Sequence, residues 1–227
     1  MSNFRLADKL PGEQVLLDSI FEPYSTKEVG ICAAYQIHDP HTTHESSIIS
    51  PVELGSIMNA IEDDRLSKLS KPKLVFTTAK DGTSLKTFLS KTCEGSSIIL
   101  IRSVSGRSVV GAFCSDRWAM KSHDPYFGRG ISFVFRLRPL QIYKWCHDNS
   151  LSKFQRLTNE SLEVGAGIGS GSAALKLDSN LAHCRSGPSP TFNSPSLLND
   201  PSDCTDPNPI SRCIIVGEME LFALQDL

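Results

Sequence analysis

Short apolar runs separated by turn residues dominate the middle of the chain, between residues 72 and 140. Each run is rich in β-branched and aromatic side chains, and the residues between the runs include Asp81-Gly82 and Ser105-Gly106. Such dipeptides form tight turns, and short β-branched runs are typical of strands. The pattern therefore predicts a series of antiparallel hairpins with strands at residues 74–78, 97–102, 108–113 and 133–137.

Two segments have helical periodicity instead. Ser50, Pro51 and Glu53 are the residue types expected at the N-cap, the first helical position and the third position of a helix. Apolar residues then recur at i, i+3, i+4 and i+7 from Leu54 to Ile61, which gives the helix one apolar face. We predict a helix over residues 51–66 that packs on the sheet, and a shorter helix over residues 84–89 that begins at Ser84.

The C-terminal third divides into three parts. Residues 165–171 are rich in glycine and superficially resemble a dinucleotide-binding loop, but Ser170 occupies the third glycine position and a strand pattern follows. A hairpin turn is the favoured interpretation. Residues 186–212 are rich in Pro, Ser, Asn and Asp, which predicts a long surface loop. Residues 213–222 predict the last strand, in which the apolar Met219 and Leu221 alternate with Glu218 and Glu220.

Together these elements predict an α+β domain in which two antiparallel β-sheets pack as a sandwich with short helices on the outside. The predicted core consists of apolar residues on the inward faces of these elements. They are Leu74, Phe76, Leu85, Phe88, Ile99, Ile101, Val110, Phe113, Phe133, Phe135, Leu175, Leu177 and Ile215.

Charge and cysteine content narrow the class of protein. Lys plus Arg total 23 against 25 for Asp plus Glu, so the chain lacks the basic excess of nucleic-acid-binding proteins. The seven cysteines are widely spaced, odd in number and without a Cys-x-x-Cys pair. This favours reduced thiols over a disulfide framework, and over a zinc site at Cys184, Cys204 and Cys213.

We expect the N-terminal part to be an extension of the domain and not a signal peptide. Residues 1–47 are acidic and form a loosely attached extension in this interpretation, with a short helix at 12–21 and a short strand at 29–37. His38, His41 and His44 are spaced by three, but Pro40 and the neighbouring threonines favour a solvated loop over a metal site. No apolar leader or bilayer-length run occurs. We expect a cytoplasmic protein that reaches vesicle or organelle membranes only through a partner.

Several sequence motifs, in the same order along the chain, resemble those of the TLDc domain family. Their residues are most similar to those in the TLDc domains of TBC/TLDc Rab-GAP-like proteins. The resemblance covers residues 48 to about 224, which defines the predicted TLDc domain as residues 48–227. The matching motifs are Ile48-Ile-Ser-Pro-Val-Glu53, Asp81-Gly-Thr-Ser-Leu85, Gly111-Ala-Phe-Cys-Ser-Asp-Arg-Trp118, Tyr126-Phe-Gly-Arg-Gly-Ile-Ser-Phe-Val-Phe135, Arg136-Leu-Arg-Pro139, Leu177-Asp-Ser-Asn-Leu181 and Pro190-Thr-Phe-Asn193.

The resemblance implies the TLDc fold and a non-enzymatic interaction module. It links the chain to oxidative-stress protection, vesicle trafficking and binding of the cytosolic sector of the V-ATPase. The Rab-GAP-like kinship adds small GTPases and vesicle membranes as further partners. The chain departs from the family pattern at Ile131, where a glutamate is usual, and at Cys184, where a glycine is usual. It also has Gly165-Ala-Gly167 for three glycines.

Candidate binding residues lie in one turn and one strand. Tyr126, Phe127 and Arg129 combine aromatic and arginine side chains, which are enriched at binding hot spots; the alternative is that the aromatics pack inward. Arg136 and Arg138 would share one side of a strand by alternation, and with Arg129 and Lys144 they could form a basic face for a phosphoinositide or membrane.

No P-loop, G-x-S-x-G or H-E-x-x-H motif occurs. We therefore expect no catalytic residue, no cofactor and no metal. A redox-active thiol remains the alternative from a different class, because a reactive cysteine depends on its surroundings rather than on a sequence motif. A membrane adaptor that uses the basic strand face is the second alternative.

Overall fold

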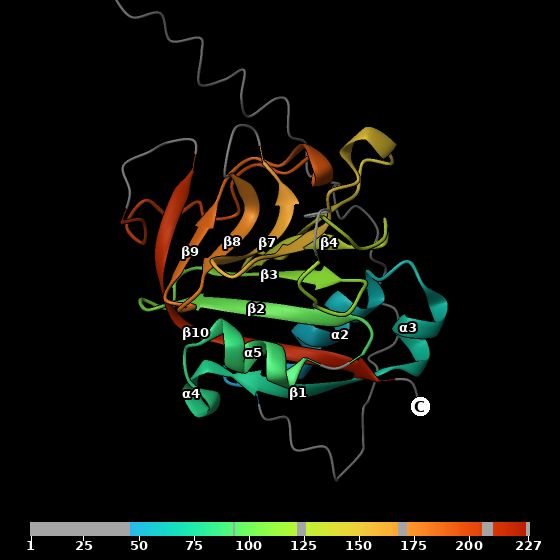
Figure 1. The fold of residues 1–227 in the computed structure, drawn as a ribbon, viewed down its shortest axis with the longest axis horizontal. Helices are drawn as coiled ribbons and strands as arrows, with labels where there is room; N and C mark the ends of the chain where they lie inside the picture. The colour runs from blue at the N-terminus through green and yellow to red at the C-terminus, as the bar shows by residue number, and fades with distance from the viewer. Residues whose placement is uncertain (1–45, 93, 122–125, 168–171, 206–210, 226–227) are drawn as a thin grey trace, which may run out of the picture.

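The computed structural model describes residues 46–225 except 93, 122–125, 168–171 and 206–210 (Figure 1). Within this part no helix is long and apolar enough to cross a bilayer. The predictions for residues 12–21, for residues 29–37 and for the three histidines lie outside it. The described helices are α2 (Pro51–Asn59), α3 (Asp64–Leu69), α4 (Thr78–Asp81), α5 (Leu85–Lys91) and the 3-10 turns η1 (Asn149–Leu151) and η2 (Pro190–Phe192).

The strands form two antiparallel sheets that share β10. One sheet, sheet A, has the order β5-β4-β3-β2-β10-β1, and the other, sheet B, has the order β10-β9-β8-β7-β6. The strands are β1 (Lys71–Thr77), β2 (Ser97–Ser103), β3 (Val109–Cys114), β4 (Phe133–Leu137), β5 (Gln141–Lys144), β6 (Gln155–Leu157), β7 (Ser161–Ala166), β8 (Ala173–Asp178), β9 (His183–Ser186) and β10 (Arg212–Gln225).

Strand β10 turns from one sheet into the other at a bulge. Its first residues pair with β9, and the rest pairs with β2 and β1, with a register shift between Val216 and Glu218. Gly217 occupies the shift, and a Cβ there would lie 2.9 Å from the Ser103 carbonyl oxygen. A bulge bends a strand locally, so the glycine allows β10 to cross the corner of the sandwich, as the long red strand shows (Figure 1).

Two apolar layers hold the sheets and helices together. The first lies between the sheets and includes Ile99 and Ile101 of β2 with Leu175 of β8. The second lies between sheet A and α2 and includes Ile98 and Leu100 of β2. A strand buried on both faces reads as a continuous apolar run, as β2 does. The predicted α+β sandwich with flanking short helices is confirmed.

The predicted core is correct at all but two positions. Leu74 is only partly buried, against the layer under α2. Ile215 is 48% exposed, because its neighbour Ile214 takes the inward position on β10 and Ile215 faces the solvent side of sheet B opposite His183. The prediction of strand β10 was correct, but it placed Ile215 on the inward face, where the structure has Ile214.

The helix predicted over residues 51–66 is two helices. The first part has the expected capping box, in which Ser50 and Glu53 bond each other's backbone amides. This helix, α2, ends at Asn59 with Ala60 as its C-cap. Asp63 then caps α3 by accepting from the amides of Arg65 and Leu66. An aspartate whose carboxylate bonds the amides two and three residues later starts a new helix, so apolar spacing alone overestimated the length.

The first part of the predicted surface loop, residues 186–198, is largely buried, whereas the described residues from 199 to 212 are exposed or half-buried. Ser186 and Ser189 are fully covered, and Phe192 and Leu198 join the layer between the sheets. Serine hydroxyls bond backbone carbonyls there: Ser186 Oγ donates to Ala174 at 2.6 Å and Ser189 Oγ to Ala166 at 2.7 Å. Polar composition was misleading because small hydroxyl side chains can be buried when they are bonded.

The predicted hairpins are confirmed. Strands β2 and β3 pair around Gly106, whose φ is 75°, a value that glycine adopts readily. Strands β7 and β8 pair antiparallel from Ser161↔Asp178 to Ala166↔Ala173, so a strand and not a helix follows the glycine-rich stretch. The dinucleotide interpretation is therefore excluded at this position, because a phosphate loop needs the N-terminus of a helix.

An ion pair attaches α2 to the end of β4. Arg138 Nε donates to Glu53 Oε1 at 3.0 Å, and the same guanidinium donates to the Ile48 carbonyl oxygen at 3.0 Å. The hydrogen bond from Arg138 lowers the pKa of Glu53 from 4.5 to about 2, against the opposing effect of partial burial. The helix, the N-terminal segment and the strand end are thus held by one arginine.

We predict that this pair stabilises the fold above pH 4.5 and that the contribution disappears between pH 4.5 and about 2. A carboxylate with a lowered folded-state pKa binds fewer protons when folded, so unfolding becomes easier as it protonates. Arg138→Gln should raise the pKa of Glu53 and weaken this acid dependence. Side-chain NMR titration and denaturant unfolding across this range check both points. An unchanged Glu53 pKa in the variant would contradict the assignment.

A substitution at Phe135 tests the packing of the apolar layer between sheet A and α2. Its side chain is fully buried, so Phe135→Ala should lower the free energy of unfolding by about 3–5 kcal/mol. Ile215→Ala is a matched control because Ile215 is exposed, and it should change the value by less than about 0.5 kcal/mol. Denaturant unfolding of the three proteins gives the comparison. A loss under about 1 kcal/mol at Phe135 would contradict its burial.

Candidate partner-binding surface

The turn at residues 126–130 is fixed between the two sheets. Phe127 forms an isolated bridge with Gln155, the first residue of β6. Gly128 has φ of 103°, which favours glycine, and a Cβ at Gly130 would overlap the ring of Trp145. The two glycines of this motif are therefore required by backbone conformation and by close packing. The turn is a rigid platform for the side chains on it.

Phe127 packs inward. It is 8% exposed, and its ring lies 6.1 Å from that of Trp118 in a T-shaped arrangement. The Lys121 ammonium lies 4.7 Å from the centre of the Phe127 ring, at a distance where a cation is attracted to an aromatic face. Phe127 therefore anchors the turn and presents little surface to a partner.

Arg129 lies at the surface and is tied to the end of β3. Its Nε lies 3.1 Å from Asp116 Oδ1, and its Nη2 donates to the Ser115 carbonyl oxygen at 3.1 Å. Gln155 is fully buried beside it and bonds the backbone of Asp116 in both directions. Because Arg129 keeps 58% of its side chain exposed, its outer atoms remain available for a contact.

Tyr126 belongs to a charged cluster on the outer face of sheet B. Its hydroxyl donates to Glu163 Oε2 at 3.3 Å, and the Arg156 guanidinium lies 5.6 Å from its ring centre. Glu163 also faces Lys176 at 2.8 Å and Arg156 at 3.5 Å. Burial, and secondarily the charge of Glu163, raises the pKa of Tyr126. The hydroxyl therefore stays protonated at neutral pH and acts as a donor.

Arg136 and Arg138 do not share a face, which corrects the alternation argument. Arg136 lies between Phe135 and Leu137, both on the α2 side, so it points to the opposite side, where its charge acts on Tyr143. Strand β4 ends at Leu137, and Arg138 has φ of 63° and reaches Glu53 instead.

The predicted basic face is therefore not formed. Arg129 pairs with Asp116, Arg138 with Glu53, and Lys144 with Glu62. These acid partners remove most of the local positive charge on which a membrane adaptor would depend. Tyr126, Phe127, Arg129, Arg136 and Arg138 lie in different surroundings, and their proposed role in partner binding stays a prediction.

Two buried glutamates on β10 connect the two ends of the domain, and sequence reasoning missed them. Ser46 Oγ and the Ser47 amide donate to Glu220 at 2.5 and 2.8 Å. Ser47 Oγ, Thr77 Oγ1 and Arg102 donate to Glu218. A buried carboxylate needs such donors. Ser46 and Ser47, which precede α2, are thus bonded to the last strand.

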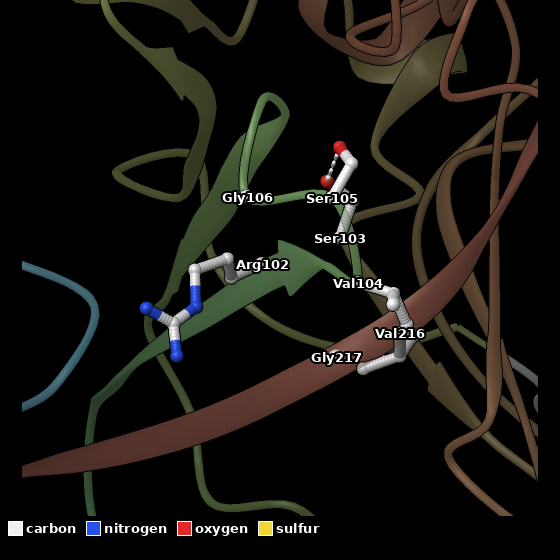
Figure 2. A pocket seen from close by; sticks show the side chains of 7 residues that line it. All are labelled: Arg102, Ser103, Val104, Ser105, Gly106, Val216 and Gly217. Carbon is white, nitrogen blue, oxygen red and sulfur yellow. Dashed lines mark hydrogen bonds between the residues drawn. The ribbon is translucent and has the colours of Figure 1, made fainter.

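The hollow in Figure 2 carries little chemistry. It is lined by Arg102, Ser103, Val104, Ser105, Gly106, Val216 and Gly217 at the corner crossed by β10. Figure 2 shows the Ser103 and Ser105 hydroxyls close together and the Arg102 side chain directed away from them. Asp203 accepts from both hydroxyls and from the Ser108 amide, so these groups stabilise the turn.

The described cysteines are mostly inert in their surroundings. Cys114 and Cys184 are completely buried, and burial strongly raises the pKa of both thiols. Cys213 is also buried, and Cys146 is exposed. A thiol with a raised pKa is a poor nucleophile. In the described part of the chain, no three metal-ligating side chains gather in one place, so Cys184, Cys204 and Cys213 form no such group.

The sequence is similar to a known domain family and to several known proteins. The TLDc domain family model matches residues 42–225. The chain is 35% identical over 147 residues to human Oxidation resistance protein 1 and 32% identical over 153 residues to human Nuclear receptor coactivator 7. These matches cover 59% and 66% of this chain but only 16% and 14% of the relatives.

A relative in Drosophila melanogaster, GTPase-activating protein skywalker, is 28% identical over 144 residues, which cover 56% of this chain and 24% of that protein. The chain thus spans about a quarter or less of each of these relatives. The resemblance of the sequence motifs to the TLDc domain family is confirmed. Because the family model matches more than half of the chain, this protein belongs to the TLDc domain family.

Proposed function

We propose that this chain is a non-enzymatic TLDc interaction module that binds the cytosolic sector of the V-ATPase and takes part in oxidative-stress protection and vesicle trafficking. The observation that carries the proposal is the family match over residues 42–225. Relatives named Oxidation resistance protein 1 occur in several vertebrates, which supports the link to oxidative stress. The proposed place of action is the cytoplasm, at the surface of vesicles or organelles.

The chemistry of the described residues supports binding rather than catalysis. The hollow at the corner of the sandwich is lined by hydroxyl, apolar and glycine residues and one arginine, a set that lacks an acid–base pair. The polar clusters around Asp203, Gln155 and Glu218 are saturated by internal hydrogen bonds. A scaffold whose turns are held this firmly suits recognition by surface side chains.

Capture of V-ATPase subunits from cell extract by the full chain tests this proposal. We expect recovery of the pump with the wild type and reduced recovery with Arg129→Gln. Arg129 and Arg138 are the predicted contact residues with ion pairs in the described part of the chain, and the Arg129 side chain is the more exposed of the two. Glutamine removes the charge without placing a second carboxylate beside Asp116. Quantitative immunoblotting of a pump subunit gives the measurement.

Arg117→Gln is the matched control, since Arg117 is an arginine of similar exposure that pairs with Glu94. It should leave recovery unchanged. Both variants should melt within a few degrees of the wild type. Equal recovery with Arg129→Gln and wild type would remove the turn from the interface, and the absence of recovery with all three proteins would refute the V-ATPase proposal.

The alternative function is that of a redox-active thiol protein, and the exposure of one cysteine favours testing it. Cys146 is the exposed cysteine of the described set, with its sulfur 3.5 Å from the Pro190 carbonyl oxygen. An accessible thiol is the type that oxidants reach first. Under the interaction proposal, however, no thiol is needed for protection.

We therefore predict that Cys146→Ser leaves protection from hydrogen peroxide unchanged in cells that depend on this protein. A chain in which all seven cysteines are replaced by serine or alanine should also protect, provided that its circular dichroism and melting temperature stay close to the wild type. Survival curves at graded peroxide concentrations provide the measurement. Loss of protection in a folded cysteine-free chain would establish the thiol mechanism instead.

A further inference from the structure

Serine is followed by proline at three places in the sequence, Ser50-Pro51, Ser189-Pro190 and Ser194-Pro195, and no threonine precedes a proline. This dipeptide is the minimal recognition element of proline-directed protein kinases, which accept a residue without a backbone N–H directly after the serine. The structure separates the three pairs, because Ser189 and Ser194 are completely buried and Ser50 is exposed. In the folded protein an enzyme can therefore reach Ser50 and not the other two.

The backbone around Ser50 suits access by a kinase. Ser50 is extended, with φ of −81° and ψ of 159°, as expected for a residue before proline. Pro51 and Val52 in the first turn of α2 are exposed, and the first buried residue of the helix is Leu54. Helix ends open at low cost in free energy, and this turn can open without uncovering an apolar core residue of α2.

The Ser50 hydroxyl lies close to a guanidinium. Ser50 Oγ donates to Glu53 Oε2 at 2.8 Å, and Arg138 Nη2 donates to the same oxygen at 3.3 Å. Arg138 also uses Nε for Glu53 and Nη2 for the Ile48 carbonyl oxygen. In the described part of the chain no bond involves its Nη1, and the side chain is 49% exposed. A cation that solvent can reach is thus adjacent to the hydroxyl.

A phosphate on this hydroxyl would replace Glu53 as the partner of Arg138. It carries about 1.5 to 2 negative charges at neutral pH, and its outer oxygens extend two bonds beyond Oγ toward the guanidinium. Arginine binds phosphate in a bidentate, charge-assisted geometry. The carboxyl of Glu53 has a pKa of about 2 and is ionised, so the phosphate repels it. The single guanidinium then favours the group of higher charge.

We propose that Ser50 is the substrate of a proline-directed protein kinase and that Arg138 binds the resulting phosphoserine in place of Glu53. The γ-phosphoryl group of magnesium ATP is the group transferred. A bond forms between the γ-phosphorus and Ser50 Oγ while the bond from that phosphorus to the bridging oxygen of ADP breaks. The hydroxyl proton passes to the general base of the kinase.

The modification changes the contact that holds α2 to the end of β4. A dianion takes the place of a neutral hydroxyl, and the Glu53 carboxylate is released toward solvent. The N-terminal end of α2 thereby becomes strongly acidic at the surface. This site goes beyond the proposed interaction role and does not depend on the identity of the partner.

Incubation of the full chain with a purified mitogen-activated protein kinase and magnesium ATP tests the site. Intact mass and peptide mapping should find one phosphate, on Ser50, and none on Ser189 or Ser194. Pro51→Ala keeps Ser50 exposed and places a good helix former at the first helical position, so it should fold but lose the phosphate. Circular dichroism melts check the fold of the variant.

Three results would overturn the kinase site. They are an unmodified wild-type chain, equal phosphorylation of Pro51→Ala, and comparable phosphate on Ser189 or Ser194. The last result would show that exposure in the folded protein does not select the serine.

Phosphorus NMR titration of the modified chain tests the role of Arg138. A guanidinium favours the dianion, so Arg138→Gln should raise the pKa of the phosphate by about 0.5 or more. Arg117→Gln, at an arginine that pairs with Glu94 instead, should leave it unchanged. Phosphorylation should also raise the pKa of the Glu53 carboxyl from about 2, because that group loses its cation and gains an anionic neighbour. A phosphate pKa that is equal in both variants, with an unchanged Glu53, would overturn the contact with Arg138.

Discussion

Strand β10 has to supply backbone partners to two sheets within 14 residues. Its first residues complete sheet B beside β9, and its remainder lies between β1 and β2 in sheet A. Gly217 makes the transition possible because the Ser103 carbonyl leaves no room for a side chain. A slip of one residue would exchange the two faces of the strand. The packing of both apolar layers therefore depends on the register at this bulge.

The same strand explains how the start of the domain is held. Glu218 and Glu220 face the side covered by α2 and are almost fully buried. Buried carboxyl groups in that position require donors, and Ser46 and Ser47 provide them together with Thr77 and Arg102. The segment before α2 thus contacts the last strand of the chain. Burial of these acids and attachment of the N-terminal segment depend on each other.

The surfaces available for binding follow from this framework. The turn at residues 126–130 is held by Gln155 and Trp145, so it stabilises the join between the sheets. The side chains of Arg129 and Tyr126 reach solvent, whereas that of Phe127 is buried. The antiparallel order of β6 to β9 instead brings single charged residues from four strands into one row. Contacts among these side chains therefore depend on strand pairing and not on any single sequence motif.

The sequence by itself determined the fold class, the hairpins and most of the core. Local turn chemistry at Ser105-Gly106, the capping box at Ser50 and β-branched runs such as β2 act over a few residues, so they can be recognised in one sequence. The motifs from Ile48 to Asn193 also determined the family. These signals are local, and for that reason tertiary contacts did not change them.

Only the tertiary structure decided the inward face at Ile215, the burial of the serine-rich loop and the environment of the candidate residues. Arg136 and Arg138 separated because β4 ends between them, and Glu163 was found beside Arg156 and Lys176 because the strand register brought them together. Alternation along β7 could have marked Glu163 as outward-facing, but not its neighbours. Pairing between strands depends on long-range packing, which no short stretch of sequence contains.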